Sequence, residues 1–365
     1  MRLVTVLGAR PQFIKASVVS SELAKCAGVQ EVVIHTGQHF DANMSDLFFA
    51  ELGMSKPAHE LGIHGGPHGE MTGRMLIGIE RILADERPDI VLIYGDTNST
   101  LAGALAAVKL HIPVAHVEAG LRSFNMRMPE EVNRIVTDRV STWLFAPTGE
   151  AVTHLGREGV DPARIHQVGD VMYDVALHHG ARAAGRANGA VRRLGLVEKG
   201  FALATVHRAE NTDDPDRLEV IVDALAEVGR GLPLVWPLHP RTRAVLERVG
   251  LLSRLEQSVR LIEPQGYLDM LELEHSAVVI ATDSGGVQKE AFFHRVPCVT
   301  LRDETEWMEL VVGGWNTLAA PVSAKAVIEA IETAIGRQGS DITPYGNGDA
   351  AKRIAHHLSG VGIIT

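Results

Sequence analysis

Several residues that can transfer protons come at the ends of short, mainly apolar runs. Asp96, Glu118 and His207 each lie within two residues of such a run. Carboxylates held close together tend to have separated pKa values, which suits one to accept a proton and another to donate it. A histidine at the tip of a buried strand can titrate near neutral pH. These residues predict general acid–base chemistry.

Some acidic residues in these positions also have a structural explanation. An aspartate before a helix commonly caps that helix, so Asp96 could be a cap instead of a proton carrier. Acidic residues in a first helical turn offset the helix dipole, and we assign Glu131 to that task. His207 precedes Arg208 at its strand end, and this pairing favours a functional histidine.

A second group of residues suits a phosphate ligand. Ser284, Gly285 and Gly286 follow the apolar run 277–281 and precede a predicted helix. Small residues there allow backbone N–H groups at the helix start to approach a pyrophosphate. Glu290 lies about one and a half helical turns further on, within reach of a ribose diol. The segment therefore predicts a site for a nucleoside diphosphate.

Cations and a further histidine accompany other strand ends. Arg10 and Lys15 lie near the start of the first predicted helix, where anions are attracted. The glycine pattern of a dinucleotide fingerprint is absent from this segment. His239 sits between Leu238 and Pro240 and could either pack under prolines or face a ligand.

The strands that must position these residues are recognisable as β-branched runs alternating with helix-length segments. These runs occupy residues 3–7, 32–36, 90–94, 113–117, 143–146, 165–168, 201–206, 234–238, 259–262, 277–281, 297–301 and 317–320. Continuous apolar strands alternating with helices are typical of parallel sheets covered on both faces. We predict an α/β protein of two doubly wound, Rossmann-like domains. Ligands bind beyond the carboxyl ends of such strands, so one cleft between the domains is expected to hold the site.

Chain length supports two domains, because 365 residues exceed the size at which a single core usually keeps growing. We place the N-terminal domain at residues 1–170 and the C-terminal domain at residues 171–345. A polar stretch rich in arginine and glycine separates them. A helix at about residues 346–360 is expected to pack back on the first domain.

Composition excludes several classes of function. A net charge of −10 argues against a nucleic-acid partner. The two cysteines, Cys26 and Cys298, do not suggest a disulfide framework or a thiolate metal site. No apolar run approaches the ~18 residues of a membrane span. We expect a cytoplasmic protein with no membrane association, no metal and no cofactor.

Taken together, the segments resemble the non-hydrolysing UDP-N-acetylglucosamine 2-epimerase family. The resemblance covers nearly the whole chain in the same order. The matching segments are Gly8-Ala9-Arg10-Pro11, Tyr94-Gly95-Asp96-Thr97, Val117-Glu118-Ala119-Gly120-Leu121-Arg122, Pro129-Glu130-Glu131, His207-Arg208-x-Glu210-Asn211 and Thr282-Asp283-Ser284-Gly285-Gly286. The resemblance implies the two-domain GT-B architecture of many nucleotide-sugar glycosyltransferases, a UDP-binding C-terminal domain, a homodimer, and no need for a metal or nicotinamide.

The resemblance also implies roles for individual residues. Positions used in or beside the family's proton transfers fall on Asp96, Glu118, Glu130 and His207. Positions that hold UDP fall on Arg10, His239, Ser284, Gly285, Gly286 and Glu290, and Lys15 matches a position near the site.

Departures from the family's main branch point to one sub-branch. The main branch usually has Gly-Thr-Arg-Pro-Glu where this chain has Gly8-Ala9-Arg10-Pro11-Gln12. It has Thr-Glu-Arg-Pro-Glu where this chain has Thr305-Glu306-Trp307-Met308-Glu309. With His35-Thr36-Gly37-Gln38-His39-Phe40-Asp41, these features resemble the sub-branch acting on UDP-2,3-diacetamido-2,3-dideoxy-glucuronate in surface polysaccharide (lipopolysaccharide O-antigen) synthesis. The 6-carboxylate of that sugar would want an extra cation, for which Arg127 and Arg302 are candidates.

The expected activity is therefore inversion at C2 by elimination and re-addition of UDP through a glycal. The first alternative is a UDP-N-acetylglucosamine 2-epimerase that makes UDP-N-acetylmannosamine. A GT-B glycosyltransferase, a hydrolysing epimerase and a non-catalytic UDP-sugar sensor are further alternatives.

Overall fold

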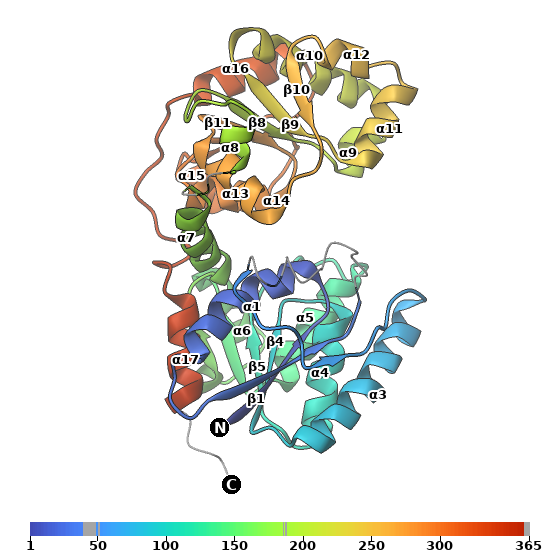
Figure 1. The fold of residues 1–365 in the computed structure, drawn as a ribbon, viewed down its shortest axis with the longest axis vertical. Coiled ribbons are helices and arrows are strands. Elements are labelled where there is room, and N and C mark those ends of the chain that lie inside the picture. Colours follow the sequence, from blue (N-terminus) through green and yellow to red (C-terminus); the bar gives the residue numbers. More distant parts are fainter. Residues whose placement is uncertain (39–48, 50–51, 185, 187, 361–365) are drawn as a thin grey trace. The chain divides into compact units, whose positions relative to one another are not determined.

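The computed structural model describes residues 1–38, 49, 52–184, 186 and 188–360. The chain divides into two compact units (Figure 1). Unit 1 contains Met1–Val175 and Thr343–Thr365, and unit 2 contains Ala176–Ile342. None of the helices within the described ranges is both long and apolar enough to cross a bilayer.

Unit 1 is built on a parallel sheet of seven strands in the order β3-β2-β1-β4-β5-β6-β7. The strands are β1 (Arg2–Leu7), β2 (Gln30–His35), β3 (His59–Glu60), β4 (Ile90–Tyr94), β5 (Val114–Val117), β6 (Trp143–Ala146) and β7 (Ile165–Gln167). The helices are α1 (Arg10–Leu23), α3 (His68–Glu86), α4 (Asn98–Lys109), α5 (Pro129–Val140), α6 (Gly149–Arg157), α7 (Val171–Ala184), which continues into unit 2, and α17 (Ala350–Gly360), with a short 3-10 turn at Pro162–Arg164.

The strand order of unit 1 reverses direction between β1 and β4. Such a switch point opens a crevice at the carboxyl ends of the two strands. Every residue of β4 is buried, because helices cover both faces of the sheet. Helices α3 and α4 pack together on one side, and α1 and α17 pack together on the other (Figure 1).

Unit 2 repeats this plan with six parallel strands in the order β10-β9-β8-β11-β12-β13. The strands are β8 (Ala202–Thr205), β9 (Leu234–Pro237), β10 (Val259–Ile262), β11 (Val279–Thr282), β12 (Cys298–Thr300) and β13 (Asn316–Leu318). The helices are α8 (Ala190–Arg193), α9 (Ala209–Thr212), α10 (Pro215–Gly231), α11 (Pro240–Arg248), α12 (Leu252–Leu255), α13 (Tyr267–Ser276), α14 (Gly285–Phe293), α15 (Met308–Val312) and α16 (Ala324–Ala334). Its switch point lies between β8 and β11.

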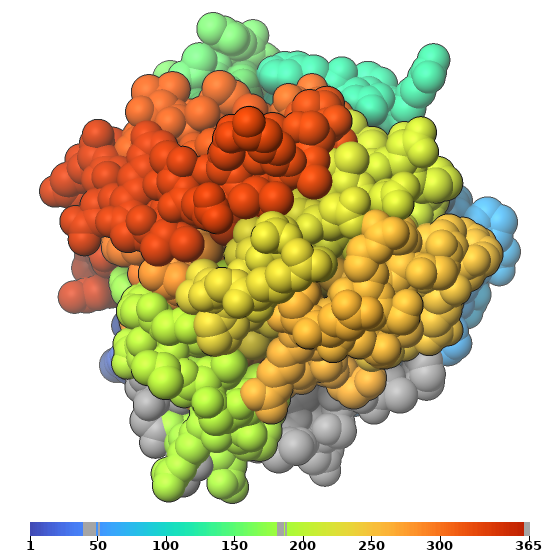
Figure 2. All heavy atoms as spheres, turned by 90° about the horizontal axis from the view of Figure 1, so that it is seen from above, coloured from blue at the N-terminus to red at the C-terminus, as the bar shows by residue number. Residues whose placement is uncertain are grey.

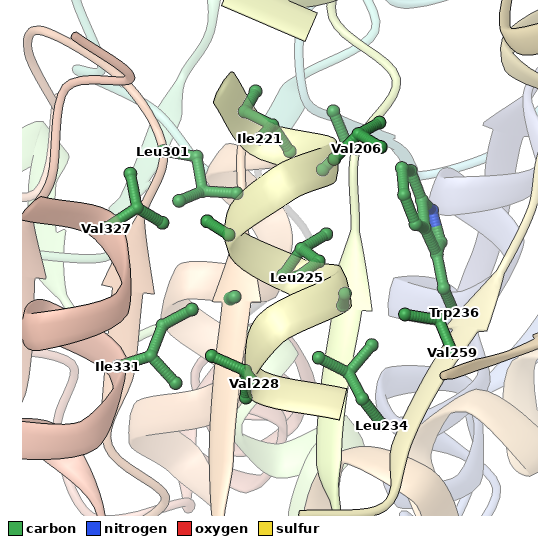
Figure 3. Packing of buried hydrophobic residues seen from close by; sticks show 14 of the residues in the cluster. Val206, Ile221, Leu225, Val228, Leu234, Trp236, Val259, Leu301, Val327 and Ile331 are labelled. Atoms are coloured by element: carbon green, nitrogen blue, oxygen red, sulfur yellow. The ribbon is translucent and has the colours of Figure 1, made fainter. Parts of the chain in front are cut away.

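The core of unit 2 shows why these segments fold as they do. Helix α10 turns Ile221, Leu225 and Val228 toward the sheet, at the spacing that places residues on one helical face (Figure 3). Helix α16 adds Val327 and Ile331 to the same cluster (Figure 3). On the surface, α16 (red-orange) lies beside α10 (yellow), as Figure 2 shows.

The predicted fold class, two doubly wound α/β domains, is confirmed. The strand missed by the sequence analysis is β3, whose two residues, His59 and Glu60, offer no apolar run to recognise. The residues His39, Phe40 and Asp41, which contributed to the sub-branch resemblance, lie outside the described residues.

The last helix is fixed to unit 1 by a buried carboxylate. The side chain of Asp174 accepts hydrogen bonds from the N–H groups of Ala350 at 3.2 Å and Ala351 at 2.8 Å. Burial raises the pKa of Asp174 to about 6, and the charges of Asp349 and Asp170 add to this effect. The folded protein therefore binds this proton more tightly than the unfolded chain does.

Because the folded pKa is raised, stability falls as the pH rises through the interval between the ordinary value of 3.8 and about 6. An asparagine in place of Asp174 would lose the charge and keep only one of the two acceptor oxygens. We expect Asp174→Asn to raise the free energy of unfolding at about pH 8 by at most about 2 kcal/mol, because a gain of up to about 3 kcal/mol from the lost charge is offset by about 1 kcal/mol for the N–H group left without its acceptor. Thermal melts between about pH 4 and pH 8 should show the difference shrinking toward acid, and a lower melting temperature of the variant at the alkaline end would contradict the assignment.

Candidate functional site

In unit 1, Gln12 joins the two strand ends at the switch point. Its side-chain oxygen accepts the N–H groups of Gly8 at 2.7 Å and Ala9 at 3.0 Å. Its amide group donates to the carbonyl oxygen of Tyr94 at 2.6 Å. A glutamate, which the main branch of the resembled family has here, would have no N–H for that carbonyl when ionised. Glutamine in place of glutamate at position 12 therefore allows the side chain to bind the carbonyl at the end of β4.

Gly8 is required where β1 ends. A Cβ atom at this position would lie 1.9 Å from the hydroxyl oxygen of Ser99 and 2.4 Å from that of Thr36. Only glycine permits α4 to approach β1 this closely. The first turn of α1, which begins at Arg10, contacts the end of β4 through the hydrogen bond from Gln12 to Tyr94.

Glu118 directly follows β5 in an unusual backbone conformation. Its φ is +76°, a value that non-glycine residues adopt rarely and mainly at functional sites. Its carboxylate forms an ion pair with the ammonium group of Lys15. A Cβ atom on Gly95 would lie 3.4 Å from the Glu118 carboxylate and 3.9 Å from the Lys15 nitrogen. The pair therefore lies over the end of β4, next to Asp96.

A buried network holds the strained turn at Glu118 in place. Asp138 of α5 is fully buried and accepts hydrogen bonds from His116 at 2.7 Å and from the N–H of Gly120 at 3.1 Å. It also pairs with Arg122 at 2.8 Å. Burial raises the pKa of Asp138, but the hydrogen bond from His116 and the charge of Arg122 outweigh burial, and the pKa lies below its ordinary value.

His116 also connects this network to the neighbouring strand. Its second ring nitrogen donates to the carbonyl oxygen of Gly95 at 2.7 Å. One side chain thus fixes the backbone on both sides of the candidate site, at Gly95 and, through Asp138, at Gly120.

Asp96 is aligned by α5. Its carboxylate accepts a hydrogen bond from Arg134 at 2.6 Å, and its carbonyl oxygen accepts one from Asn133 at 2.9 Å. The helix after Asp96 is capped by Thr97, whose hydroxyl accepts the N–H of Thr100, so Asp96 is not needed as its cap. Asp96 remains about one-third exposed, which leaves it accessible to a ligand.

The two acidic residues at the start of α5 have different environments. Glu130 is half-buried in the first helical turn. Glu131 is fully buried and accepts the N–H groups of Ser123 at 2.9 Å and Phe124 at 2.9 Å. Glu131, which we assigned to the helix dipole, thus also holds the loop that follows Glu118. Unit 1 brings Lys15, Asp96 and Glu118 together and places Glu130 at the adjoining helix start.

In unit 2, Asp283 organises the switch point. It is fully buried and accepts the N–H groups of His207 at 3.1 Å and Arg208 at 3.0 Å, and the side-chain amide of Asn211 at 3.1 Å. One ring nitrogen of His207 lies 3.4 Å from the same carboxylate. The His207 side chain is 51% exposed. A buried carboxylate thus steadies an accessible histidine, the arrangement of many general acid–base histidines.

The start of α14 has the features of an anion site. Ser284 caps the helix, with its hydroxyl accepting the N–H of Val287. A Cβ atom on Gly285 would lie 3.5 Å from the indole nitrogen of Trp307, 3.7 Å from the guanidinium of Arg208 and 3.8 Å from the carboxylate of Glu306, which Arg302 binds. The first N–H groups of a helix have no acceptor within it. The positive end of the helix, an indole N–H and a guanidinium therefore lie around one point, with a carboxylate that is already paired beside them.

The remaining candidates of unit 2 are placed as follows. His239 is exposed at the end of β9 and its ring accepts the N–H of Arg241, so it caps α11 instead of packing under prolines. Gly286 is exposed in the first turn of α14, and Glu290 is half-buried on the same helix. Arg302 is buried and binds Glu210 at 3.0 Å and Glu306 at 2.9 Å.

Sequence reasoning missed the positioning residues His116, Asp138 and Asp283. A usable signal existed only for Asp283, which precedes the Ser-Gly-Gly segment at a strand end. In the part of the chain that the structure describes, no cluster of three histidine, cysteine or acidic side chains is arranged to hold a metal ion.

Comparison with known protein families shows which family the chain belongs to. The family model described as UDP-N-acetylglucosamine 2-epimerase matches residues 21–359. The chain belongs to this family. It is an isomerase of the UDP-sugar 2-epimerase class, as predicted.

Relatives and solved structures of this epimerase family match over the whole length. The UDP-2,3-diacetamido-2,3-dideoxy-D-glucuronate 2-epimerase of Pseudomonas aeruginosa is 55% identical over 364 residues, covering 98% of this chain and 99% of the relative. The UDP-N-acetylglucosamine 2-epimerase of Methanocaldococcus jannaschii is 43% identical over 364 residues, with coverages of 98% and 99%. The crystal structure of the Methanocaldococcus jannaschii enzyme with UDP-GlcNAc and UDP matches the present structure with a TM-score of 0.84 and 43% identity. The match covers 98% of this chain and 99% of the crystallised chain.

Proposed function

We propose that the enzyme inverts C2 of UDP-2,3-diacetamido-2,3-dideoxy-glucuronate to give the manno epimer. The observation that carries this choice of sugar is the 55% identity to the Pseudomonas aeruginosa relative with that activity in its name, over nearly the full length of both chains. The departures at Gln12 and Trp307 from the main branch agree with it. A role in O-antigen synthesis, a homodimeric assembly and a cytoplasmic location are further parts of the proposal.

The chemistry must make an unreactive proton removable. C2 of a 2-acetamido sugar is not next to a carbonyl carbon, so no enolate can form. When the anomeric C–O bond breaks, UDP leaves with the bonding electrons and C1 gains oxocarbenium character. A base then takes the C2 proton, and its electrons form the C1–C2 double bond of a glycal. Protonation of C2 from the opposite face and return of UDP to C1 give the epimer.

Two faces of C2 require at least two acid–base groups. We assign these tasks to Asp96, Glu118 and Glu130 of unit 1 and to His207 of unit 2. Lys15, paired with Glu118, supplies a positive charge beside the carboxylates.

The leaving diphosphate needs donors that are already oriented. We assign it to the start of α14, formed by Ser284, Gly285 and Gly286, together with Arg10 and His239. The N–H of Ser284 donates to the hydroxyl of Thr282, so the N–H groups of Gly285 and Gly286 are the backbone donors assigned to the diphosphate. Glu290 is assigned to the ribose hydroxyls. That these groups and the carboxylates of unit 1 serve one UDP-sugar in a shared cleft stays a prediction.

The 6-carboxylate of the proposed sugar requires a cation. Arg302 already forms salt bridges with Glu210 and Glu306. Arg127 is exposed, in the loop before α5, and is therefore the better candidate. We expect Arg127→Gln to raise KM for the glucuronate substrate about 10-fold or more, because charge-assisted hydrogen bonds contribute about 1.5–3 kcal/mol. Steady-state assays should show no such change for Arg157→Gln, an exposed arginine of α6. An unchanged KM for Arg127→Gln would remove this residue from the site.

The substrate itself is tested by direct comparison. Purified enzyme is incubated separately with UDP-2,3-diacetamido-2,3-dideoxy-glucuronate and UDP-N-acetylglucosamine, and the C2 epimers are followed by NMR. We expect turnover of the glucuronate with far higher kcat/KM. Turnover confined to UDP-N-acetylglucosamine would reject the proposed sugar and leave the first alternative.

A further inference from the structure

The loop after β12 places a tryptophan beside the start of α14. Trp307 directly precedes α15, and its indole nitrogen lies 3.5 Å from the position that a Cβ atom of Gly285 would occupy. The guanidinium of Arg208 lies 3.7 Å from the same position. Because Gly285 has no side chain, a ligand can approach the first N–H groups of α14 closely there. An indole N–H and a guanidinium therefore lie next to the backbone donors that we assign to the diphosphate.

Contacts from two directions hold the Trp307 ring in this place. The ammonium group of Lys289, a buried residue of α14, lies over the ring at 4.5 Å from its centroid. The backbone N–H of Trp307 donates to the hydroxyl of Thr305 at 3.2 Å, and this hydroxyl donates to the side-chain oxygen of Gln288 at 2.6 Å. Gln288 is fully buried and also accepts a hydrogen bond from Asn316 at 3.0 Å. The indole is therefore oriented before a ligand binds, which reduces the entropic cost of using its N–H group.

A carboxylate near the same point is paired with a buried arginine. Glu306 lies 3.8 Å from the Cβ position of Gly285. Its two oxygens bind Arg302 at 2.9 Å and 3.2 Å, and Arg302 is only 4% exposed. This pairing limits the repulsion that Glu306 would exert on an anion. Trp307 and Arg208 can then act as side-chain donors to a phosphate group at this point.

We propose that Trp307 is a substrate-binding residue whose indole N–H donates a hydrogen bond to the diphosphate of the UDP-sugar. The inference rests on the proposed assignment of the diphosphate to the start of α14. It gives a chemical role to one departure from the main branch of the family, which has arginine where this chain has Trp307. Both side chains donate N–H groups, but the indole does so without a charge and with a single N–H.

Binding measurements with two ligands test this role. UDP and uridine are titrated into the full-length protein by calorimetry, with wild type, Trp307→Phe and Trp315→Phe. Phenylalanine at position 307 keeps an aromatic ring beside Lys289 and removes the N–H group. We expect Trp307→Phe to weaken UDP binding about 10-fold, because a hydrogen bond to a charged group is lost, and to leave uridine binding within about 2-fold of wild type.

Trp315→Phe is the matched control. Trp315 also belongs to unit 2, and its indole donates to the carbonyl oxygen of Ser340 at 2.8 Å, so this variant loses an indole hydrogen bond elsewhere. It should bind UDP as wild type does, and an equal loss of UDP affinity in both variants would overturn the proposal. So would a Trp307→Phe protein that loses uridine affinity as much as UDP affinity, or that loses neither. A wild type that binds no UDP would reject the proposed function as well, which separates the two failures.

Nitrogen-15 labelling of tryptophan keeps the inference testable if Trp307→Phe does not fold. The chain has four tryptophans, so its indole N–H signals are few and can be assigned with single phenylalanine variants of the other three. The Trp307 proton signal of wild type should move downfield when UDP binds, because a hydrogen bond to phosphate deshields the proton, and should stay in place with uridine. A Trp307 signal that UDP leaves unmoved would show that the indole does not bind the diphosphate.

Discussion

Replacing Glu118 with glutamine should lower kcat about a thousandfold while UDP affinity stays within about 3-fold, because positioned acid–base groups contribute about 10²–10⁴ to a rate. The amide keeps the size of the side chain and cannot transfer a proton. Glu118 also has the strongest structural indication of function, namely a φ of +76° maintained by the buried Asp138 and His116 network. Such strain persists only where the surroundings enforce it.

Steady-state kinetics and UDP calorimetry on the same preparation measure this effect. Glu150→Gln is the matched control, because Glu150 is a carboxylate of unit 1 whose side chain is 72% exposed. The control should retain wild-type kcat. A Glu118→Gln enzyme with more than about one-tenth of wild-type kcat would show that Glu118 is not an acid–base group of the reaction.

Replacing Asp283 with alanine should lower the free energy of unfolding by about 3–5 kcal/mol, as expected when buried polar groups lose a charged partner. Alanine would leave the N–H groups of His207 and Arg208 and the amide of Asn211 without their acceptor. The His207 ring would also lose the carboxylate at 3.4 Å. We therefore expect kcat of the folded fraction to fall at least 100-fold.

Denaturant unfolding and kinetics of Asp283→Ala are to be compared with Asp303→Ala. Asp303 is also an aspartate of unit 2, paired with Arg217, but its side chain is 64% exposed. The control should change stability by less than about 1 kcal/mol. Asp283→Asn distinguishes orientation from folding: its amide oxygen can still accept N–H groups, so it should be more stable than the alanine variant, yet its kcat should fall because the His207 ring loses the carboxylate at 3.4 Å. A wild-type kcat in Asp283→Asn would assign Asp283 a structural role alone.

Much of the fold could be predicted from the sequence because parallel strands buried on both faces are continuous apolar runs. The runs 90–94, 143–146 and 259–262 coincide with β4, β6 and β10. Candidate residues at strand ends were recognisable for the same reason, since the carboxyl end of a parallel strand is where ligands bind. The sheet order, with its switch points between β1 and β4 and between β8 and β11, does not follow from the runs themselves.

The supporting residues could not be predicted because their partners are far away in the sequence. Asp138 in α5 has no feature that distinguishes it from a surface acid until β5 places His116 beside it. The role of Gln12 is likewise recognisable only in the folded protein, where the carbonyl of Tyr94 at the end of β4 accepts its hydrogen bond. Local pattern identifies reactive groups, whereas tertiary structure identifies the groups that orient them.

Deuterium incorporation tests the elimination and re-addition chemistry most directly. The enzyme is incubated in deuterated water with UDP-2,3-diacetamido-2,3-dideoxy-glucuronate, and C2 of the product is observed by NMR. We predict a manno epimer that carries deuterium at C2, with no stoichiometric accumulation of free UDP. An epimer that retains its original proton at C2, or sugar consumption in step with UDP release, would contradict inversion through a bound glycal.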